Sequence, residues 1–481
     1  MRVRLTNDPT AVGQAFQPAT AVGQAFQPAN ATGKRPVSSH QDCDCDCQCA
    51  CPTDGAPIPV LSLPVAYYLE LTPACNSRCP GCGNVYAAGR ASLPPPLAGE
   101  AWRALIARLA SHAGQFKLTG GEATLHPAFA QIVHAVEERG IPFTLFTNGR
   151  WAHPAALVHL LRDTATCEGL LVSLHGPDAA THEAFSGVPG SFDETAANVR
   201  RAVEAGLDVA ISMVIHRHNW DHVEETLDLS LSLGANHVVC NRFVGAPGAE
   251  VAPSQAQLCA AVATVESLRA AGRPVRFGNC IPQCFIASSS RGCTAGSTFA
   301  TLDPWGRMRP CNHAPLVAGD LRTQSIEEVW QGQAMARWRS LVPAGCATCP
   351  ALAACHGGCR AQALLAGQDQ DPLVRGVLEE TRRQGDKGTR RPDPVLPLYA
   401  GLRPVGRFTH RLEGGVGVLL CKSTVVPVPP GCDGVIPKLD GSMTLRQIGR
   451  QYGGAAVDWI GALHQEGMVT WASRNRDFRS L

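Results

Sequence analysis

The chain has 481 residues, 45% of them hydrophobic, and a formal charge of +2 at pH 7. This length suggests about three domains and is enough to bury a large core. A nearly neutral chain without a clustered basic surface argues against a nucleic-acid-binding protein. No run approaches about 18 consecutive apolar residues, and the N-terminus has no apolar signal segment, so we expect neither a membrane span nor secretion.

Cysteine is the outlier of the composition, with 21 residues. In a small secreted protein this number would predict disulfides. In a long chain with C-x2-C and C-x3-C groups, metal binding is the better interpretation. Thiolates that bind metal must stay reduced, so we expect a cytoplasmic protein.

Residues 1–62 differ from the rest of the chain and are expected to form a low-complexity extension. The nine residues Ala11–Ala19 return unchanged as Ala21–Ala29, and two copies are too few for a solenoid. The run Cys43–Cys51 has a cysteine at every second position. It either scavenges soft metal ions or belongs to a tail without fixed structure.

The next part of the chain alternates apolar, strand-like segments with helix-like ones. Trp102, Leu105 and Ile106, for example, follow the i, i+3, i+4 spacing of a buried helix face. Six such units predict an α/β fold, in which a parallel sheet curls into a partial (β/α)6 TIM-like barrel over residues 63–279. The predicted strands are 65–72, 115–119, 142–147, 169–175, 207–215 and 236–243.

Three cysteines, Cys75, Cys79 and Cys82, follow the first predicted strand with the spacing C-x3-C-x2-C. Four thiolates would close the ligand shell of a zinc ion or a cubane iron–sulfur cluster, whereas three leave one metal position open to a small molecule. The loop follows the carboxyl end of a strand, where (β/α) barrels carry their chemistry. Taken alone, the three cysteines would also fit part of a zinc site.

A second motif, Gly120-Gly121-Glu122, ends the next predicted strand. Two glycines let the backbone approach a ligand closely, and a carboxylate can accept a hydrogen bond from an ammonium group. Such a motif alone is more often an ordinary turn. Its place, one strand–helix unit after the cysteine triad, makes it informative.

Together, the triad and the Gly-Gly-Glu motif resemble the radical SAM superfamily. The resemblance implies that the three cysteines hold a [4Fe–4S] cluster whose open iron chelates S-adenosylmethionine (SAM). It implies reductive cleavage of SAM to a 5′-deoxyadenosyl radical, with the Gly-Gly-Glu motif at the methionyl amino group. One departure is Gly81, where the family usually has an aromatic residue before the third cysteine.

Polar residues at later strand ends are further candidates for SAM binding. They are Asn148 after the third strand, Ser173 at the end of the fourth and Arg242 at the end of the sixth. Each is also compatible with an ordinary turn or capping role. Ser186 stands where the family often has an arginine, so one expected SAM contact is missing or replaced. His175 is expected to pack rather than to act as a ligand.

Residues 280–375 carry a second set of cysteines, which resembles the SPASM extension of radical SAM enzymes, a domain that binds auxiliary iron–sulfur clusters. The matching residues are Cys293, Cys311, Cys346, Cys349, Cys355 and Cys359. The resemblance implies one or two auxiliary clusters. The first, second and last of these cysteines would share one cluster, with Cys284 or Cys280 as the fourth ligand, and the other three would share the second.

The end of this segment departs from the family pattern, which expects a cysteine after an Asp-Pro pair. Here Asp371 and Pro372 are followed by Leu373 and Val374, and valine cannot bind a metal. The second auxiliary site therefore has three thiolates and an unidentified ligand, for which Asp371, water and substrate are candidates. A [2Fe–2S] cluster and a structural zinc ribbon are the alternatives.

Residues 376–400 are charged and rich in proline and glycine, which predicts a linker. Residues 401–475 are expected to form a small α+β, winged-helix-like domain. Its predicted strands lie near 407–412, 416–421 and 425–428, and two helices follow, the first of them capped by Thr444.

This order of elements resembles the PqqD-like peptide-recognition fold. That fold would bind a leader peptide as an added edge strand, through backbone hydrogen bonds. A DNA-binding winged helix is disfavoured, because the helix that would read DNA carries only Arg446 and Arg450 as basic residues.

The resemblances imply a radical SAM enzyme that oxidatively modifies a ribosomally made peptide recognised through its leader. A low-potential electron donor of the flavodoxin or ferredoxin type would complete the system. One alternative is a maturase of a protein side chain or of a small cofactor precursor. A non-enzymatic alternative is an iron–sulfur electron-transfer or metal-binding protein.

Overall fold

The computed structural model describes residues 60–89, 92–245, 249–286, 292–375, 402–413 and 415–472. The nine-residue repeat, the run Cys43–Cys51 and the predicted linker lie outside the described residues. No helix within the described ranges is long and apolar enough to cross a membrane.

One ten-stranded sheet forms the larger part of the fold, in the order β10-β9-β8-β1-β2-β3-β4-β5-β6-β7. Its strands are β1 (Ala66–Glu70), β2 (Gln115–Thr119), β3 (Phe143–Thr147), β4 (Cys167–Ser173), β5 (Val209–Ile215), β6 (His237–Arg242), β7 (Val275–Phe277), β8 (Phe299–Leu302), β9 (Arg307–Arg309) and β10 (Gly319–Asp320). The six predicted strands are β1 to β6, and neighbours pair in parallel, which confirms the expected architecture. The order leaves β10 and β7 at opposite edges, so the barrel is partial.

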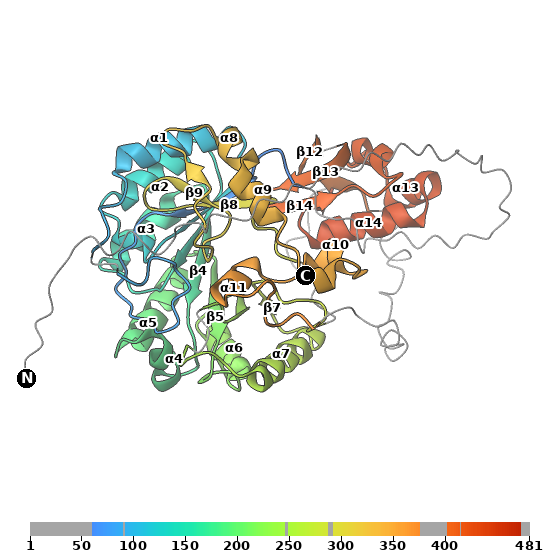
Figure 1. Ribbon diagram of the computed structural model, residues 1–481. Helices are drawn as coiled ribbons and strands as arrows, with labels where there is room; N and C mark the ends of the chain where they lie inside the picture. The colour runs from blue at the N-terminus through green and yellow to red at the C-terminus, as the bar shows by residue number, and fades with distance from the viewer. Residues whose placement is uncertain are drawn as a thin grey trace, which may run out of the picture. The chain divides into compact units, whose positions relative to one another are not determined.

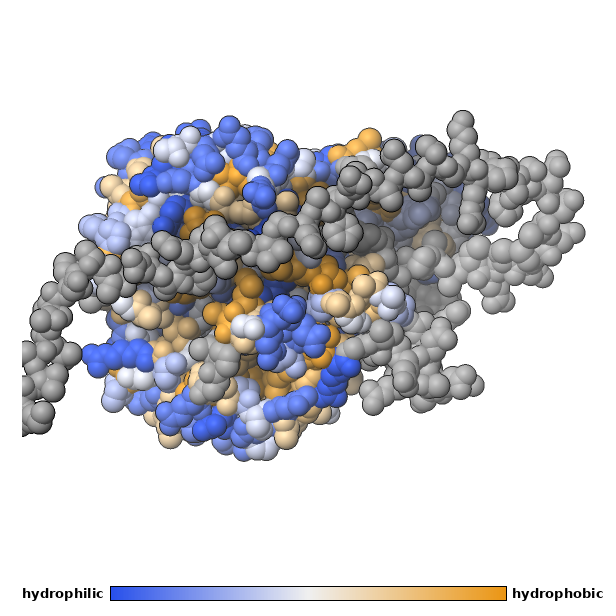
Figure 2. Space-filling view, viewed as in Figure 1, coloured by the Kyte–Doolittle hydropathy of each residue, from blue (hydrophilic) through white to orange (hydrophobic). Residues whose placement is uncertain are grey.

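Helices cover the outside of this sheet, and Figure 1 shows α1 to α7 following one another around it. They are α1 (Gly99–Leu109), α2 (Phe129–Glu137), α3 (Pro154–Asp163), α4 (Ala179–Ser186), α5 (Ser191–Glu204), α6 (Val223–Ser232) and α7 (Gln255–Ala270). The predicted face of α1 is buried, with Trp102 and Ile106 fully enclosed. Figure 2 shows hydrophilic residues over the helices at the rim and hydrophobic residues toward the middle of the same face, as expected of amphipathic helices.

The cysteine-rich segment begins within the barrel sheet, which the sequence did not predict. β8 pairs in parallel with β1, and β9 then turns back against β8 through a turn at Gly306 (φ 81°). This pairing places Arg309 of β9 beside Glu70 of β1. The rest of the segment is made of short elements: α8 (Ile326–Gln331), α9 (Gln333–Arg339), η3 (Ala344–Cys346), α10 (Leu352–Cys355) and α11 (Arg360–Leu365).

The C-terminal part has a hydrophobic core of its own, in which Val435, Ile448 and Ile460 are fully buried. Its elements are β11 (Pro404–Gly406), β12 (Thr409–Glu413), β13 (Val416–Cys421), β14 (Thr424–Pro427), η5 (Asp433–Lys438), α13 (Leu445–Tyr452), α14 (Gly454–Gln465) and β15 (Val469–Trp471). β12, β13 and β14 form the predicted three-stranded sheet, and Thr444 caps α13 through a reciprocal capping box.

Candidate active site

An open cavity of about 240 Å³ lies at the carboxyl ends of β1 to β5. This is the edge at which parallel α/β barrels place their active sites. Its wall combines the triad loop, the strand ends and two residues of the cysteine-rich segment, Asn312 and His313. Among the other residues that line it are Glu70, Cys75, Cys79, Cys82, Gly120, Gly121, Asn148, Arg150, Ser173, His175 and His182.

All three cysteines of the triad line this cavity. They come from a single loop after β1. The Sγ of Cys75 accepts hydrogen bonds from the backbone N–H of Ser77 at 3.4 Å and from the Nδ2 of Asn148 at 3.8 Å. Donors of this kind stabilise a thiolate. Three thiols on one wall of a large open cavity fit a cluster that leaves one iron accessible.

The glycines of the Gly-Gly-Glu motif let the turn after β2 lie directly against the triad loop. A Cβ atom on Gly120, which has φ 148°, would lie 2.6 Å from the carbonyl oxygen of Thr72. On Gly121 it would overlap the carbonyl oxygen of Ala74. The N–H of Gly121 donates to the Thr72 oxygen at 2.7 Å. The close approach predicted for these glycines is therefore to the backbone that carries the cysteines.

Glu122 lies behind the glycines and is only 1% exposed. Its carboxylate accepts hydrogen bonds from the hydroxyls of Thr124 (2.8 Å) and Thr147 (2.9 Å) and from the N–H of Asn148 (2.7 Å). Burial raises the pKa of Glu122, although these hydrogen bonds oppose the rise. This carboxylate ties the end of β2 to the end of β3. Its predicted contact to the amino group of SAM stays a prediction.

Asn148 lines the cavity as predicted, but its amide also holds the triad loop in place. Its Nδ2 donates to the Oδ1 of Asn76 at 2.7 Å and to the hydroxyl of Ser77 at 3.2 Å. Arg150 strengthens the same connection through the carbonyl oxygen of Asn76 (2.5 Å) and an ion pair with Glu194 (2.8 Å). The sequence analysis missed Arg150, because nothing in the local pattern distinguishes it from a surface arginine.

Ser173 lines the cavity, and a group of histidines adjoins it. The Nδ1 of His175 accepts the N–H of Val214 at 3.2 Å, and the His175 N–H donates to the Nδ1 of His182 at 3.1 Å. Burial lowers the pKa of His182 and of His216 to about 4. These rings are neutral at pH 7, and their hydrogen bonds fix β4 and β5, which fits the packing role predicted for His175.

Glu70, at the end of β1, is a cavity residue that the sequence analysis missed. It is 1% exposed and pairs with Arg309, whose guanidinium also donates to the carbonyl oxygen of Ala314 at 2.8 Å. Burial raises the pKa of Glu70 to about 7, because it outweighs the neighbouring arginine. The pair could not be predicted, since it depends on the unforeseen pairing of β8 with β1.

Two family models match this chain. The model of the radical SAM superfamily matches residues 69–230, and that of the SPASM iron–sulfur cluster-binding domain matches residues 293–350. The PqqA peptide cyclase of Ruegeria pomeroyi is 30% identical over 365 residues, which are 70% of this chain and 96% of that protein. The chain belongs to the radical SAM superfamily.

Other relatives agree with this assignment. The PqqA peptide cyclase of Xanthomonas campestris is 30% identical over 359 residues, 71% of this chain and 89% of that protein. The structure of Streptococcus suis SuiB bound to S-adenosylmethionine has a TM-score of 0.56 at 17% identity, over 66% of this chain and 78% of that one. The structure of anSMEcpe with bound AdoMet has a TM-score of 0.52 at 15% identity, over 66% and 92% of the two chains. This radical SAM enzyme thus shares its fold with both.

Arg242 of this radical SAM enzyme is bound to the SPASM segment. It is 4% exposed, and its guanidinium forms a two-point ion pair with the carboxylate of Asp371, at 2.5 and 2.9 Å. Asp371 also accepts the N–H of Cys359 at 2.8 Å. Arg242 is not among the residues that line the cavity, and its predicted contact to SAM stays a prediction. Both oxygens of Asp371, one of the three candidate ligands of the second auxiliary cluster, already accept hydrogen bonds.

Three cysteines of the SPASM segment form a first group. Cys293, Cys311 and Cys359 pack around a small core that contains Trp338. The three predicted members therefore lie together. Burial raises the pKa of Cys280 well above its ordinary value, and the charges of Cys293, Cys359 and Cys355 raise it further.

A second group surrounds a separate, small pocket of about 10 Å³. The pocket is lined by Cys284, Cys346, Cys349 and Cys355, with Val374 beside them. Across the described residues, no three His, Cys, Asp or Glu side chains are close enough to hold a single metal ion. A cluster binds each thiolate through a separate iron, so its ligands need not converge on one point.

Proposed function

We propose that Cys75, Cys79 and Cys82 bind the [4Fe–4S] cluster on which this radical SAM enzyme cleaves SAM. That cluster supplies the electron that breaks the sulfonium bond and yields the 5′-deoxyadenosyl radical. The support is geometric: three thiols of one loop share a wall of the cavity, and Asn148 and Ser77 donate hydrogen bonds to the first of them. Glu122 and Arg150 hold the loop from behind.

We propose that SAM binds in the same cavity, between the triad loop and the ends of β2 to β4. Gly120 and Gly121 present backbone there, and Asn148 and Ser173 present polar side chains. The wall of this cavity also includes apolar side chains such as Phe146 and Leu171, as is usual for ligand sites.

The substrate we propose is a ribosomally made peptide. The observation that carries this proposal is the 30% identity to PqqA peptide cyclases over nearly the whole of the Ruegeria pomeroyi relative. The product would be a peptide oxidised at a side chain or a backbone carbon. The peptide would give a hydrogen atom to the radical, which becomes 5′-deoxyadenosine, and a second electron and a proton would leave the peptide radical, the electron going to an auxiliary iron–sulfur cluster.

We further propose that the C-terminal domain, of the PqqD-like type, binds the leader of that peptide. β12 pairs only with β13 in its sheet, so one side of this strand is open within the described residues. Leu412 on β12 is 70% exposed, and Val416 at the start of β13 is 44% exposed. An added strand gains backbone hydrogen bonds at such an edge and apolar contacts beside it. Tethering the leader there raises the effective concentration of the core peptide at the cavity.

The thiolates also indicate where the enzyme works. Cysteines that bind iron must stay reduced, which favours the cytoplasm. A flavodoxin or ferredoxin is the proposed source of the low-potential electron.

The test uses the reconstituted full chain and synthetic peptides encoded beside its gene. We expect one peptide to bind and to be oxidised as 5′-deoxyadenosine forms. Deleting residues 402–472 should abolish peptide oxidation while leaving uncoupled SAM cleavage. Leu412→Asp should weaken leader binding at least tenfold, whereas Val317→Asp, at a 38% exposed position of the SPASM segment, should not. Unchanged peptide turnover after the deletion would refute leader recognition by this domain.

A further inference from the structure

The second auxiliary site has lost the cysteine that its family pattern expects, because Val374 stands in that place. Val374 is 9% exposed and lines the pocket with Cys346, Cys349 and Cys355. An isopropyl side chain therefore faces the sulfurs where a thiolate is expected. Asp371, the nearest acidic alternative along the chain, is held by Arg242 and by the N–H of Cys359.

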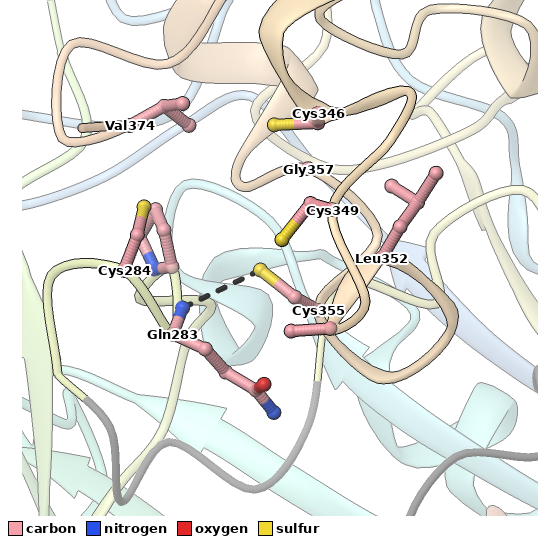
Figure 3. Close-up of a pocket in the computed structure, with 10 residues that line it drawn as sticks. Gln283, Cys284, Cys346, Cys349, Leu352, Cys355, Gly357 and Val374 are labelled. Carbon is pink, nitrogen blue, oxygen red and sulfur yellow. Dashed lines mark hydrogen bonds between the residues drawn. The ribbon is translucent and has the colours of Figure 1, made fainter. Parts of the chain in front are cut away.

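A fourth cysteine nevertheless reaches this pocket, from the loop that follows β7. Figure 3 shows the sulfurs of Cys346, Cys349 and Cys355 around the pocket, with Cys284 across from them. Gln283, the residue before Cys284, donates its N–H to the Sγ of Cys355 at 3.4 Å. The loop therefore contacts the pocket through both Gln283 and Cys284.

Two short segments, Cys280–Cys284 and Cys355–Cys359, each begin and end with a cysteine of the SPASM segment. Cys355 lines the pocket, whereas Cys359 belongs to the first group. The residues between them include His356, Gly357 and Gly358, all with positive φ (58°, 75° and 87°), and this left-handed turn lets the chain pass from one group to the other.

Cys280 and Cys284 have the same sequence separation as Cys355 and Cys359 and divide in the same way. Cys284 lines the pocket, whereas Cys280 does not. The Sγ of Cys284 also accepts the N–H of Arg375 at 3.2 Å, so the residue after Val374 contacts the sulfur directly.

We propose that Cys284 is the fourth thiolate of the second auxiliary iron–sulfur cluster and replaces the cysteine missing at Val374. Cys280 then completes the first cluster, and each auxiliary cluster has four thiolates. Neither keeps an iron open to substrate, so the auxiliary clusters exchange electrons only. This inference does not depend on the identity of the substrate.

The test starts from full-length protein with Cys75→Ala, Cys79→Ala and Cys82→Ala, in which the remaining iron is auxiliary. Two cubane clusters should give about eight irons per chain. Adding Cys349→Ala or Cys293→Ala assigns one electron paramagnetic resonance signal of the reduced protein to each cluster. We expect Cys284→Ala to change the signal that Cys349→Ala changes. A change in the signal assigned by Cys293→Ala, or no change, would overturn the proposal.

Two further measurements keep the proposal testable if Cys284→Ala folds poorly. Adding cyanide to the starting protein should leave both auxiliary signals unaltered, and a cyanide-shifted signal would reveal an open iron and overturn the proposal. Combining Val374→Cys with Cys284→Ala should restore the second signal, because residue 374 lines the same pocket. The matched control is Cys259→Ala, whose sulfur also contacts Arg375, at 3.6 Å, and which should leave both signals unchanged.

Discussion

The cavity and the SPASM segment both present cysteines, but they surround them with different chemistry. At the cavity, three thiols share an open wall with polar groups such as Asn148 and Ser173. In the SPASM segment, Cys346 and Cys355 are buried, and the second group of thiols encloses a small pocket with apolar neighbours such as Leu352 and Val374. An open ligand position suits substrate chemistry, and a closed, low-dielectric one suits electron transfer.

The two regions also differ in how they fix their cysteines. One short loop carries the whole triad, and hydrogen bonds from Asn148 and Arg150 position it from outside. The SPASM cysteines come from distant parts of the segment, and the buried Arg242–Asp371 ion pair links that segment to the end of β6. Losing a single contact should therefore disturb activity in the first region and assembly in the second.

The largest expected effect is on SAM cleavage. Cys79→Ala should abolish 5′-deoxyadenosine formation by the reduced, reconstituted enzyme, because two thiolates cannot hold the reactive cluster. Iron in the SPASM segment should persist. Chromatography of the products and iron analysis measure the two effects. Residual 5′-deoxyadenosine at the wild-type rate would break the assignment of the triad.

The next largest effect is on stability, at the ion pair of the SPASM segment. Asp371→Asn should lower the free energy of unfolding by about 3–5 kcal/mol, because it leaves the Arg242 charge buried without its partner. Urea denaturation of the apoprotein measures this loss. Asp320→Asn, whose partner Arg322 is on the surface, should cost less than about 1 kcal/mol.

The Asp371→Asn variant also separates the two regions. Because Arg242 is committed to Asp371, the affinity for SAM of the variant that folds should match that of the wild type. If the variant lost more than tenfold in SAM affinity while keeping its auxiliary iron, Arg242 would be shown to contribute to SAM binding.

A smaller effect is expected at Glu122, behind the cavity. Glu122→Gln places an NH2 donor opposite the N–H of Asn148 or the hydroxyl of Thr147, where the carboxylate has an acceptor oxygen. This change should lower the free energy of unfolding by about 2 kcal/mol. SAM cleavage should slow as the triad loop loses its support, while auxiliary iron stays unchanged. Glu138→Gln removes an exposed pair with Arg103 and is the control, with a cost below about 1 kcal/mol. Equal destabilisation by both variants would contradict the role given to Glu122.

An effect seen only in acid is the pH dependence of stability contributed by His216. Its folded pKa, about 4, lies below the ordinary value of 6.5, so the unfolded chain binds more protons between these values. Stability is fully present above about pH 6.5 and is lost as the pH falls toward about 4. His216→Gln should reduce the slope of the free energy of unfolding against pH in this range by up to about 1.4 kcal/mol per pH unit. Denaturation at several pH values measures it, and His134→Gln, at a 58% exposed position, should leave the slope unchanged.

Elements that depend on residues close together in the sequence could be predicted from the sequence. The β1 to β6 strands, the buried face of α1 and the cap at Thr444 follow from periodicity and capping rules, and the triad follows from spacing. The pairing of β8 with β1 could not be predicted, because β8 has only four residues and its partner lies more than 200 residues away. Glu70 with Arg309 was missed for that reason.

Local sequence could not give the partners of side chains that meet distant parts of the chain. Arg242 ends a strand beside the cavity, so its position suggested SAM, whereas in the structure it pairs with Asp371, 129 residues later. Cys280 and Cys284 differ by only four positions, and spacing alone could not show that only Cys284 lines the pocket. Sequence gives the ligand types, whereas the path of the backbone decides how they are grouped.

The central claim is that the triad is the open site and that the SPASM segment is closed to small molecules. The most direct measurement is the electron paramagnetic resonance spectrum of the reduced full chain, with and without SAM. We predict that SAM alters one signal, which Cys75→Ala, Cys79→Ala and Cys82→Ala remove together. SAM that leaves this signal unaltered, or that shifts a signal persisting in the triple variant, would contradict the account.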